Sequence, residues 1–325
     1  MAAPDHSLPG PDVTIVIAAY RSRPDHLAAA IESALAQTWR ALEILVCDDS
    51  PDDRLRALVD ACADPRLAYC HNTPARGVAA NHWHAFAAAR GEFIAVLNHD
   101  DCLEPQFVER LIAPLRREPS AVLAFCDHWI MGVDGRRMQP QTDANSRAWG
   151  RAGLRAGLHQ PFVGLVVHQT IPVAMGCLIR RSALPAHLPA DAGPAYDLWL
   201  SYLLCRGGGA AWYEPERLGA WRTHATNLTA AGGFDWLSGA ARCWSAMLVD
   251  PAFDHVRADV RRLAARAWRA AAWSALARGH GGLARTSAAA SLAAQWSATS
   301  ALAWVAACLP RRLGGAVLRA RAAAR

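Results

Sequence analysis

Two adjacent carboxylates stand directly after an apolar run of the chain. Residues 93–97 are apolar, and Asn98, His99, Asp100 and Asp101 follow them. Neighbouring carboxylates ionise together at low cost only where a cation balances them. A divalent cation such as Mg²⁺ or Mn²⁺ binds carboxylate and phosphate oxygens, so this pair is a candidate metal and diphosphate site. A simpler alternative makes Asp101 the N-cap of the residues that follow it, and both roles are compatible.

A second polar cluster follows two earlier apolar runs. Tyr20 comes after residues 13–18, and Asp48 and Asp49 come after residues 42–47. A carboxylate at this place accepts a hydrogen bond from a ring N–H of a pyrimidine base, and an aromatic ring offers a face on which the base stacks. The alternatives are a helix cap for the carboxylates and a core aromatic for Tyr20. The cluster is a candidate nucleoside pocket, and the residues alone leave these alternatives open.

The segments between these clusters follow an α/β pattern. Short β-branched runs alternate with stretches in which apolar residues recur every four positions, as at Leu27, Ile31 and Leu35. This alternation predicts a Rossmann-like, mostly parallel sheet with helices on both faces. The predicted strands are 13–18, 42–47, 66–71 and 93–97, and the predicted helices begin at Pro24, near Leu55, at Val78 and at Pro105. Ligands bind at the carboxyl ends of such strands, so both polar clusters are expected at one edge of the sheet.

The turn after the first predicted strand excludes two common phosphate sites. Residues 18–25 read AAYRSRPD and contain no glycine, so the G-x-G-x-x-G turn of dinucleotide-binding folds is absent. The chain also lacks the motif G-x-x-x-x-G-K-[ST] of the P-loop proteins. With both glycine-rich motifs excluded, the sequence is consistent with a nucleotide phosphate that is held by a metal ion.

The stretches 13–53 and 77–105 resemble the family 2 glycosyltransferases of the GT-A fold, and the resemblance extends over roughly residues 12–230. It implies an enzyme that moves a sugar from a nucleotide-diphosphate donor to a hydroxyl acceptor with inversion, using Mg²⁺ or Mn²⁺ as cofactor. It also implies a role in the synthesis of cell-surface polysaccharide or glycolipid, with a glycan or lipid-linked acceptor.

The resemblance assigns roles to both polar clusters. Tyr20 and Asp49 would bind the nucleoside with support from Asp48, and Asp100 and Asp101 would hold the metal and the diphosphate.

One position departs from the family pattern. The family commonly has D-x-D-D, and here Asn98 stands first. An asparagine still binds sugar hydroxyls, so the resemblance implies a weaker metal site. The departure also leaves a second hypothesis open, in which the protein is a non-catalytic sugar-nucleotide or glycan-binding module of a polysaccharide assembly complex.

The second half of the resemblance supplies a general base. Residues 195–204 are predicted to form a helix, and Asp197 near its start is similar to the acidic residue that deprotonates the acceptor hydroxyl in the family. The acidic pair of the family can also align on Ala195, and Asp191 is then the alternative base. Asp197 has a second interpretation as a helix cap.

Residues 221–229 resemble the aromatic-Arg-x-His segment of the family. The resemblance implies that His224 reaches the metal or a phosphate oxygen and that Arg222 neutralises the leaving diphosphate.

Charge is distributed unevenly along the chain. The formal net charge is +6, but residues 236–325 contain 13 Arg and 3 Asp without Glu or Lys. We expect a catalytic domain over residues 1–235, with a donor half over 12–130 and an acceptor half over 131–235. Residues 236–325 are then an Arg-, Ala- and Trp-rich helical region, which either contacts an anionic partner or carries a solvated basic face.

The helical region is predicted to dock on an anionic membrane surface without crossing it. Trp268, Trp273, Trp296 and Trp304 are of a type that favours the boundary between lipid and water. Residues 285–311 contain too many Ser, Thr and Gln for a typical spanning helix. The alternatives are a helical cap or a homodimer interface. No nucleic-acid partner is expected.

Cysteine spacing and the N-terminus bear on location. The nine cysteines are scattered without a C-x-x-C pair, which indicates free thiols in a reducing compartment. The first residues lack the basic and apolar regions of a signal peptide. We therefore expect a cytoplasmic protein, peripheral at the inner face of the membrane.

Overall fold

The computed structural model describes residues 10–224, 233–310, 313–314 and 317–318. The described chain divides into two compact units. The first unit runs to Leu188 and resumes over Leu203–His224, and the second combines Pro189–Tyr202 with the residues after His224.

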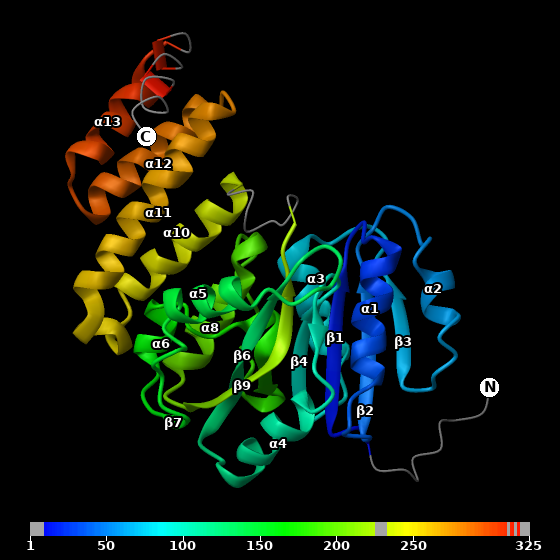
Figure 1. Ribbon diagram of the computed structural model, residues 1–325. Coiled ribbons are helices and arrows are strands. Elements are labelled where there is room, and N and C mark those ends of the chain that lie inside the picture. Colours follow the sequence, from blue (N-terminus) through cyan, green and yellow to red (C-terminus); the bar gives the residue numbers. More distant parts are fainter. Residues whose placement is uncertain (1–9, 225–232, 311–312, 315–316, 319–325) are drawn as a thin grey trace. The chain divides into compact units, whose positions relative to one another are not determined.

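A nine-stranded sheet forms the centre of the first unit (Figure 1). Its order is β3-β2-β1-β4-β8-β6-β9-β5, and β7 pairs with β9. The strands are β1 Val13–Ala19, β2 Leu42–Asp48, β3 Leu67–His71, β4 Phe93–Asn98, β5 Cys102–Leu103, β6 Ala121–Met131, β7 Gly157–His159, β8 Cys177–Arg180 and β9 Ala210–Arg222.

The four strands predicted from the sequence are confirmed, and all their pairings with one another are parallel. The second half of the sheet joins them through β8, which runs antiparallel to both β4 and β6. Strands β6 and β9 then pair in parallel, with two register shifts around Asp127. The sheet is therefore mixed, and β1 to β4 form one parallel part of it.

Helices cover both faces of this sheet because its strands are apolar on both sides. Every residue of β1 and β2 is buried. Val13, Ile15 and Ile17 pack in one core cluster with side chains of α1 and α4, while α3 contacts β1 and β2 as well. In Figure 1, α1 lies in front of these strands. The helices of this unit are α1 Pro24–Leu35, α2 Arg56–Asp60, α3 Val78–Ala88, α4 Phe107–Arg117, α5 Gln139–Ala148, α6 Val163–Val167 and α7 Val173–Gly176.

One alternative from the sequence is wrong. Asp101 does not cap a helix at the following residues, because Cys102–Leu103 form strand β5 and pair with Ala220 and Gly219 of β9. Helix α4 begins only at Phe107.

The second unit is helical. Helix α8, Tyr196–Arg206, begins in this unit, and Trp199 donates its indole N–H to the carbonyl of Gly239 in α10 at 3.1 Å. A side chain at position 239 would meet the carbonyl oxygen of Ala192, so the close approach requires glycine. The longer helices of the unit lie side by side, yellow to red in Figure 1. They are α10 Phe234–Leu248, α11 Arg257–Ala277, α12 Gly281–Ala294 and α13 Ala298–Cys308.

Within the described residues, no helix combines the length and the apolar character that a membrane crossing requires. All nine cysteines are free thiols, as expected.

Candidate active site

The polar clusters meet at one edge of the parallel strands, as the sequence predicted. Ala19 at the end of β1 pairs with Asp48 at the end of β2, and Ala18 pairs with Asn98 at the end of β4. The residues that follow these three strand ends therefore share the carboxyl edge of the sheet, where α/β folds bind ligands.

The Asp49 carboxylate is held in a cradle of donors. Its Oδ1 accepts the backbone N–H of Arg76 at 2.7 Å and the amide of Asn72 at 3.2 Å, and its Oδ2 accepts the N–H of Gly77 at 2.7 Å. A carboxylate has about four acceptor positions, so one position on Oδ2 is left for a ligand. Gly77 precedes α3 with φ +86°, a region that disfavours L side chains, and this conformation aims its N–H at Asp49.

Asp48 is fully buried behind this cradle. Its Oδ1 accepts the N–H of Ser50 at 2.9 Å, and its Oδ2 accepts the Tyr69 hydroxyl at 2.8 Å. Burial and the Asp48 carboxylate raise the pKa of Tyr69, so the phenol stays protonated and keeps donating. Asp48 thus fixes the turn that carries Asp49.

Tyr20 presents an aromatic surface beside this turn. It is 49% exposed, so its interpretation as a core aromatic is wrong. The guanidinium of Arg21 lies 5.4 Å from the centre of its ring, and the backbone N–H of Arg21 donates to the hydroxyl of Ser50 at 2.8 Å. The ring is therefore anchored next to the Asp48–Asp49 turn and is open to a stacking ligand.

The second carboxylate of the pair after β4 faces inward. Asp101 is fully buried; its Oδ1 accepts the backbone N–H of Arg222 at 2.8 Å, and its Oδ2 accepts the amide of Asn98 at 3.0 Å. Burial and the neighbouring Asp100 charge raise the pKa of Asp101 well above its ordinary value. Each oxygen of Asp101 therefore accepts one hydrogen bond within the protein and keeps one acceptor position.

Asp100 lies against His224. The Oδ2 of Asp100 is 2.9 Å from the Nε2 of His224, and the two side chains are 14% and 18% exposed. An oxygen and an imidazole nitrogen at this separation fit two adjacent ligands of one cation, since octahedral sites with bonds of about 2.1 Å place neighbouring ligands about 3 Å apart. Among the described residues, no group of three or more His, Cys, Asp or Glu side chains gathers around a metal position. The donor set fits an ion that completes its shell with phosphate oxygens and water.

Arg222 is engaged with the backbone around this pair. It is buried, and its guanidinium donates to the carbonyls of Asp100 at 2.8 Å and Val133 at 3.1 Å. These bonds tie the end of β9 to the loop that carries Asp100.

Two histidines to which the sequence analysis assigned no role lie at the site. The ring of His26 lies 5.9 Å from that of His224, and His26 is buried with no hydrogen-bond partner for Nε2. His99, between Asn98 and Asp100, likewise has no partner for its buried Nδ1. The available signal was the position of His26 one residue before Leu27, at the edge of the apolar face of α1.

The base candidates lie in the second unit. Asp197 is in the first turn of α8, its Oδ1 accepts the N–H of Leu198 at 2.8 Å, and burial raises its pKa. Asp191 pairs with Arg242 at 2.6 Å, and its side chain is 55% exposed. A general base works best when its pKa lies near the working pH. The raised pKa of Asp197 therefore suits this role better than the exposed, ion-paired carboxylate of Asp191 does.

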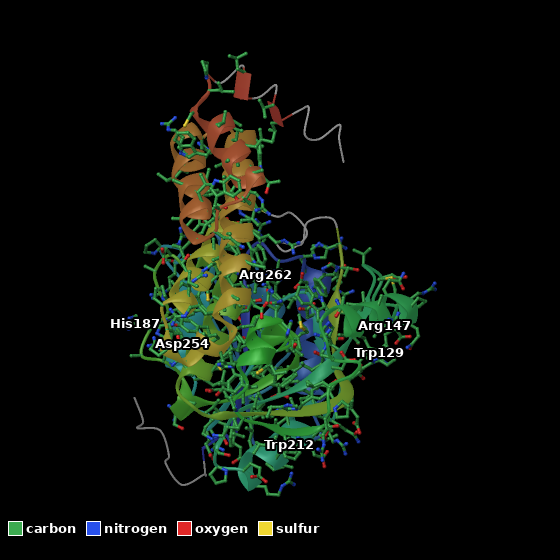
Figure 2. All side chains as sticks on the ribbon, turned by 90° about the vertical axis from the view of Figure 1, so that its left-hand side faces the viewer. Trp129, Arg147, His187, Trp212, Asp254 and Arg262 are labelled. Atoms are coloured by element: carbon green, nitrogen blue, oxygen red, sulfur yellow. The ribbon has the colours of Figure 1, made fainter. Side chains whose placement is uncertain are left out.

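A separate polar pocket of about 600 Å³ lies between β6, α5 and the irregular part of β9. Figure 2 shows Trp129 and Arg147, which both line it, on the same side of the molecule. Buried Asp127 pairs there with Arg151 at 2.7 Å. The pocket shares no lining residue with the site at the carboxyl edge.

The structure thus brings the two polar clusters singled out from the sequence to the carboxyl edge of an α/β sheet. Residues 14–184 match glycosyl transferase family 2, and the chain belongs to this family. The GT-A fold expected from the sequence is thereby confirmed, together with its C-terminal helices.

Known proteins with similar sequence or structure agree with this membership. The chain is 38% identical over 135 residues to the succinoglycan biosynthesis protein ExoO of Rhizobium meliloti (strain 1021), a match that covers 41% of this chain and 38% of that relative. The chain thus spans well under half the length of this relative.

Two solved structures share the fold. The crystal structure of S. aureus TarS 1–349 has a TM-score of 0.64 at 13% identity, over 97% of this chain and 92% of that one. The mannosyltransferase PcManGT from Pyrobaculum calidifontis, in complex with GDP-Man and Mn²⁺, has a TM-score of 0.59 at 19% identity, over 99% and 88%.

Proposed function

We propose that the protein is an inverting, metal-dependent glycosyltransferase that moves a sugar from a nucleoside diphosphate donor to a hydroxyl acceptor. Family membership supports the reaction class. The observation that carries the proposal is the Asp100–His224 pair, with 2.9 Å between Oδ2 and Nε2, at the same sheet edge as the Asp48–Asp49 turn.

The nucleoside binds at Tyr20 and Asp49 in this proposal. The exposed ring of Tyr20 stacks on the base, and the remaining acceptor position of Asp49 receives a ring N–H. Asp48 supports the turn through Ser50 and Tyr69.

Asp100 and His224 would hold Mg²⁺ or Mn²⁺ beside the diphosphate. The bound ion would supply positive charge to stabilise the leaving diphosphate. Asp101, a metal ligand by the family resemblance, stays a candidate ligand in this proposal, and it also positions the site by accepting from Arg222 and Asn98. Arg222 acts through its bonds to the Asp100 loop.

Asp197 is the general base of the proposed reaction. It accepts the proton of the acceptor hydroxyl while the hydroxyl oxygen attacks the anomeric carbon opposite the leaving nucleotide, so the configuration inverts. Its raised pKa supports this role.

The acceptor is a glycan or a lipid-linked sugar at the cytoplasmic face of the membrane, in the synthesis of cell-surface polysaccharide or glycolipid. The name of the relative ExoO, a succinoglycan biosynthesis protein, supports a polysaccharide setting.

A second candidate function is binding of a sugar nucleotide without transfer. Asn98 favours it, because an amide replaces the first carboxylate of the family motif and its N–H₂ group is engaged with Asp101. Product formation separates the two functions.

A donor panel tests the proposal. Thermal unfolding of the protein is followed with UDP-, dTDP- and GDP-sugars, each with Mn²⁺, Mg²⁺ or EDTA. The donors that stabilise the protein are then incubated with glycan acceptors, and the products are analysed. We expect at least one donor to stabilise the fold only with the cation and to give product with inverted configuration. Stabilisation without product would support the binding module, and no stabilisation by any donor would contradict both functions.

A further inference from the structure

The outward face of helix α13 is apolar. Ser300, Ala303, Ala306 and Ala307 are buried on its inner face. Leu302, Trp304 and Val305 on the other side are 46%, 43% and 48% exposed. A surface helix of a globular protein normally carries polar residues there.

A further exposed aromatic side chain precedes the helix in the chain. Trp296, in the connection from α12, is 75% exposed, and residues 286–310 contain no charged side chain. We call Trp296, Leu302, Trp304 and Val305 the α13 patch. Several large exposed apolar side chains close together in the chain mark a contact surface, in contrast to single exposed residues.

The charged residues in the part of the chain that contains the α13 patch are all arginines. From residue 260 to residue 325 there are 11 Arg and no Asp or Glu. Arg278 and Arg285 are exposed at the end of α11 and the start of α12. The core cluster formed by Ala275, Ala284 and Ala307 brings this end of the helices to the end of α13.

We infer that the α13 patch and the neighbouring arginines dock this protein on an anionic lipid bilayer. Trp favours the headgroup boundary, Leu and Val enter the acyl region, and Arg pairs with acidic headgroups. With 11 residues at 1.5 Å each, α13 is about 17 Å long, which is shorter than the hydrocarbon core of about 30 Å that a spanning helix crosses. A second copy is a poorer occupant because it would bring the same uncompensated positive charge to the contact.

The inference goes beyond the proposed function and does not depend on it. Membrane binding is measured without donor or acceptor, so its failure leaves sugar transfer untouched, and the reverse also holds.

The test is flotation of the full chain with vesicles of phosphatidylcholine alone or with about 30% phosphatidylglycerol, at about 50 and 500 mM NaCl. We expect flotation only with the anionic vesicles, with at least about tenfold loss of partitioning at the higher salt. Brominated acyl chains in the same vesicles should quench tryptophan fluorescence. Absence of flotation with anionic vesicles at low salt would overturn the inference.

Two sets of variants locate the contact. The pair Trp296→Ser and Trp304→Ser should lower partitioning about tenfold or more, whereas Trp149→Ser, at a tryptophan 38% exposed in the first unit, should not change it.

The charge is tested in the same way. Arg278→Gln with Arg285→Gln should lower partitioning about 25-fold, at about fivefold for each arginine, whereas Arg40→Gln with Arg155→Gln should leave it near the parent value. Thermal melts verify that each variant is folded. Equal loss of partitioning in the control variants would overturn the inference. A parent chain that forms a dimer and does not bind vesicles, with a tryptophan variant that is monomeric, would overturn it as well.

Discussion

Asp100 and Asp101 are neighbours in sequence, but their environments differ. Residue types alone indicated a carboxylate pair for a cation, and they could not tell which side chain faces inward. That distinction depends on Arg222, 121 residues away, whose backbone N–H occupies Oδ1 of Asp101. For the same reason His26 was missed, since its approach to His224 is created by the fold.

The two carboxylates are predicted to differ in their effect on stability. Asp101→Ala leaves the N–H of Arg222 and the amide of Asn98 without their acceptor, which costs about 2 kcal/mol of unfolding free energy. Asp100→Ala removes one partner of His224 but also relieves the repulsion between Asp100 and Asp101, so it should cost less than about 1 kcal/mol. Urea unfolding measures both. A stable Asp101→Ala protein that has lost cation binding would instead make Asp101 a metal ligand.

Asp197→Asn is predicted to lower kcat by about 10² or more with donor affinity nearly unchanged, because the amide keeps the shape but accepts no proton. Steady-state kinetics and donor titration measure the two effects. A variant that retains most of its kcat would move the base to Asp191 or to another group.

The same substitution has a pH-dependent effect on stability. Burial raises the pKa of Asp197, so its contribution to stability is complete below the ordinary pKa and is lost as the pH rises through the folded pKa. The Asn variant resembles the protonated form at every pH. It should therefore be more stable than the parent at about pH 8, with a smaller difference at about pH 4. Equal differences in melting temperature at both values would contradict the raised pKa.

At the scale of elements, the first four strands were predictable because each is a continuous apolar run of strand length bounded by polar turns. Their parallel pairing follows from the alternation with helices. Strand β8 was not predicted, since its antiparallel place between β4 and β6 is set by pairing partners more than 50 residues away. The two-residue strand β5 has no local pattern at all, because it exists through its pairing with β9.

The start of α3 supports the Asp49 cradle, and Gly77 makes this possible through its φ of +86°. Gly77→Ala should lower the unfolding free energy by about 1–3 kcal/mol and weaken nucleotide binding, because the N–H that holds Asp49 Oδ2 shifts. Gly153→Ala, with open space around it and no positive φ, is the matched control. Melting curves and nucleotide titrations measure both effects. Equal melting temperatures and equal nucleotide affinities of the two variants would refute this role of Gly77.

At the scale of the whole molecule, the first unit carries the residues proposed to bind the nucleoside and the cation, and the second carries Asp197 and the α13 patch. The division into a catalytic domain over residues 1–235 and a helical region after it stays a prediction. The structure adds that residues 189–202, with the start of α8, belong to the helical unit. A helix pattern specifies the local element but not which unit it packs in, which depends on contacts such as Trp199 with Gly239.

The central claim is that Asp100 and His224 hold a divalent cation that binds the donor diphosphate. Isothermal titration calorimetry of the full chain with UDP, dTDP and GDP, with and without Mn²⁺, tests it most directly. We predict that binding requires Mn²⁺ and that Asp100→Ala and His224→Ala each weaken it by about tenfold or more, while Asp191→Ala does not. Nucleotide binding that is equally tight without Mn²⁺, or that persists unchanged in both variants, would contradict the account.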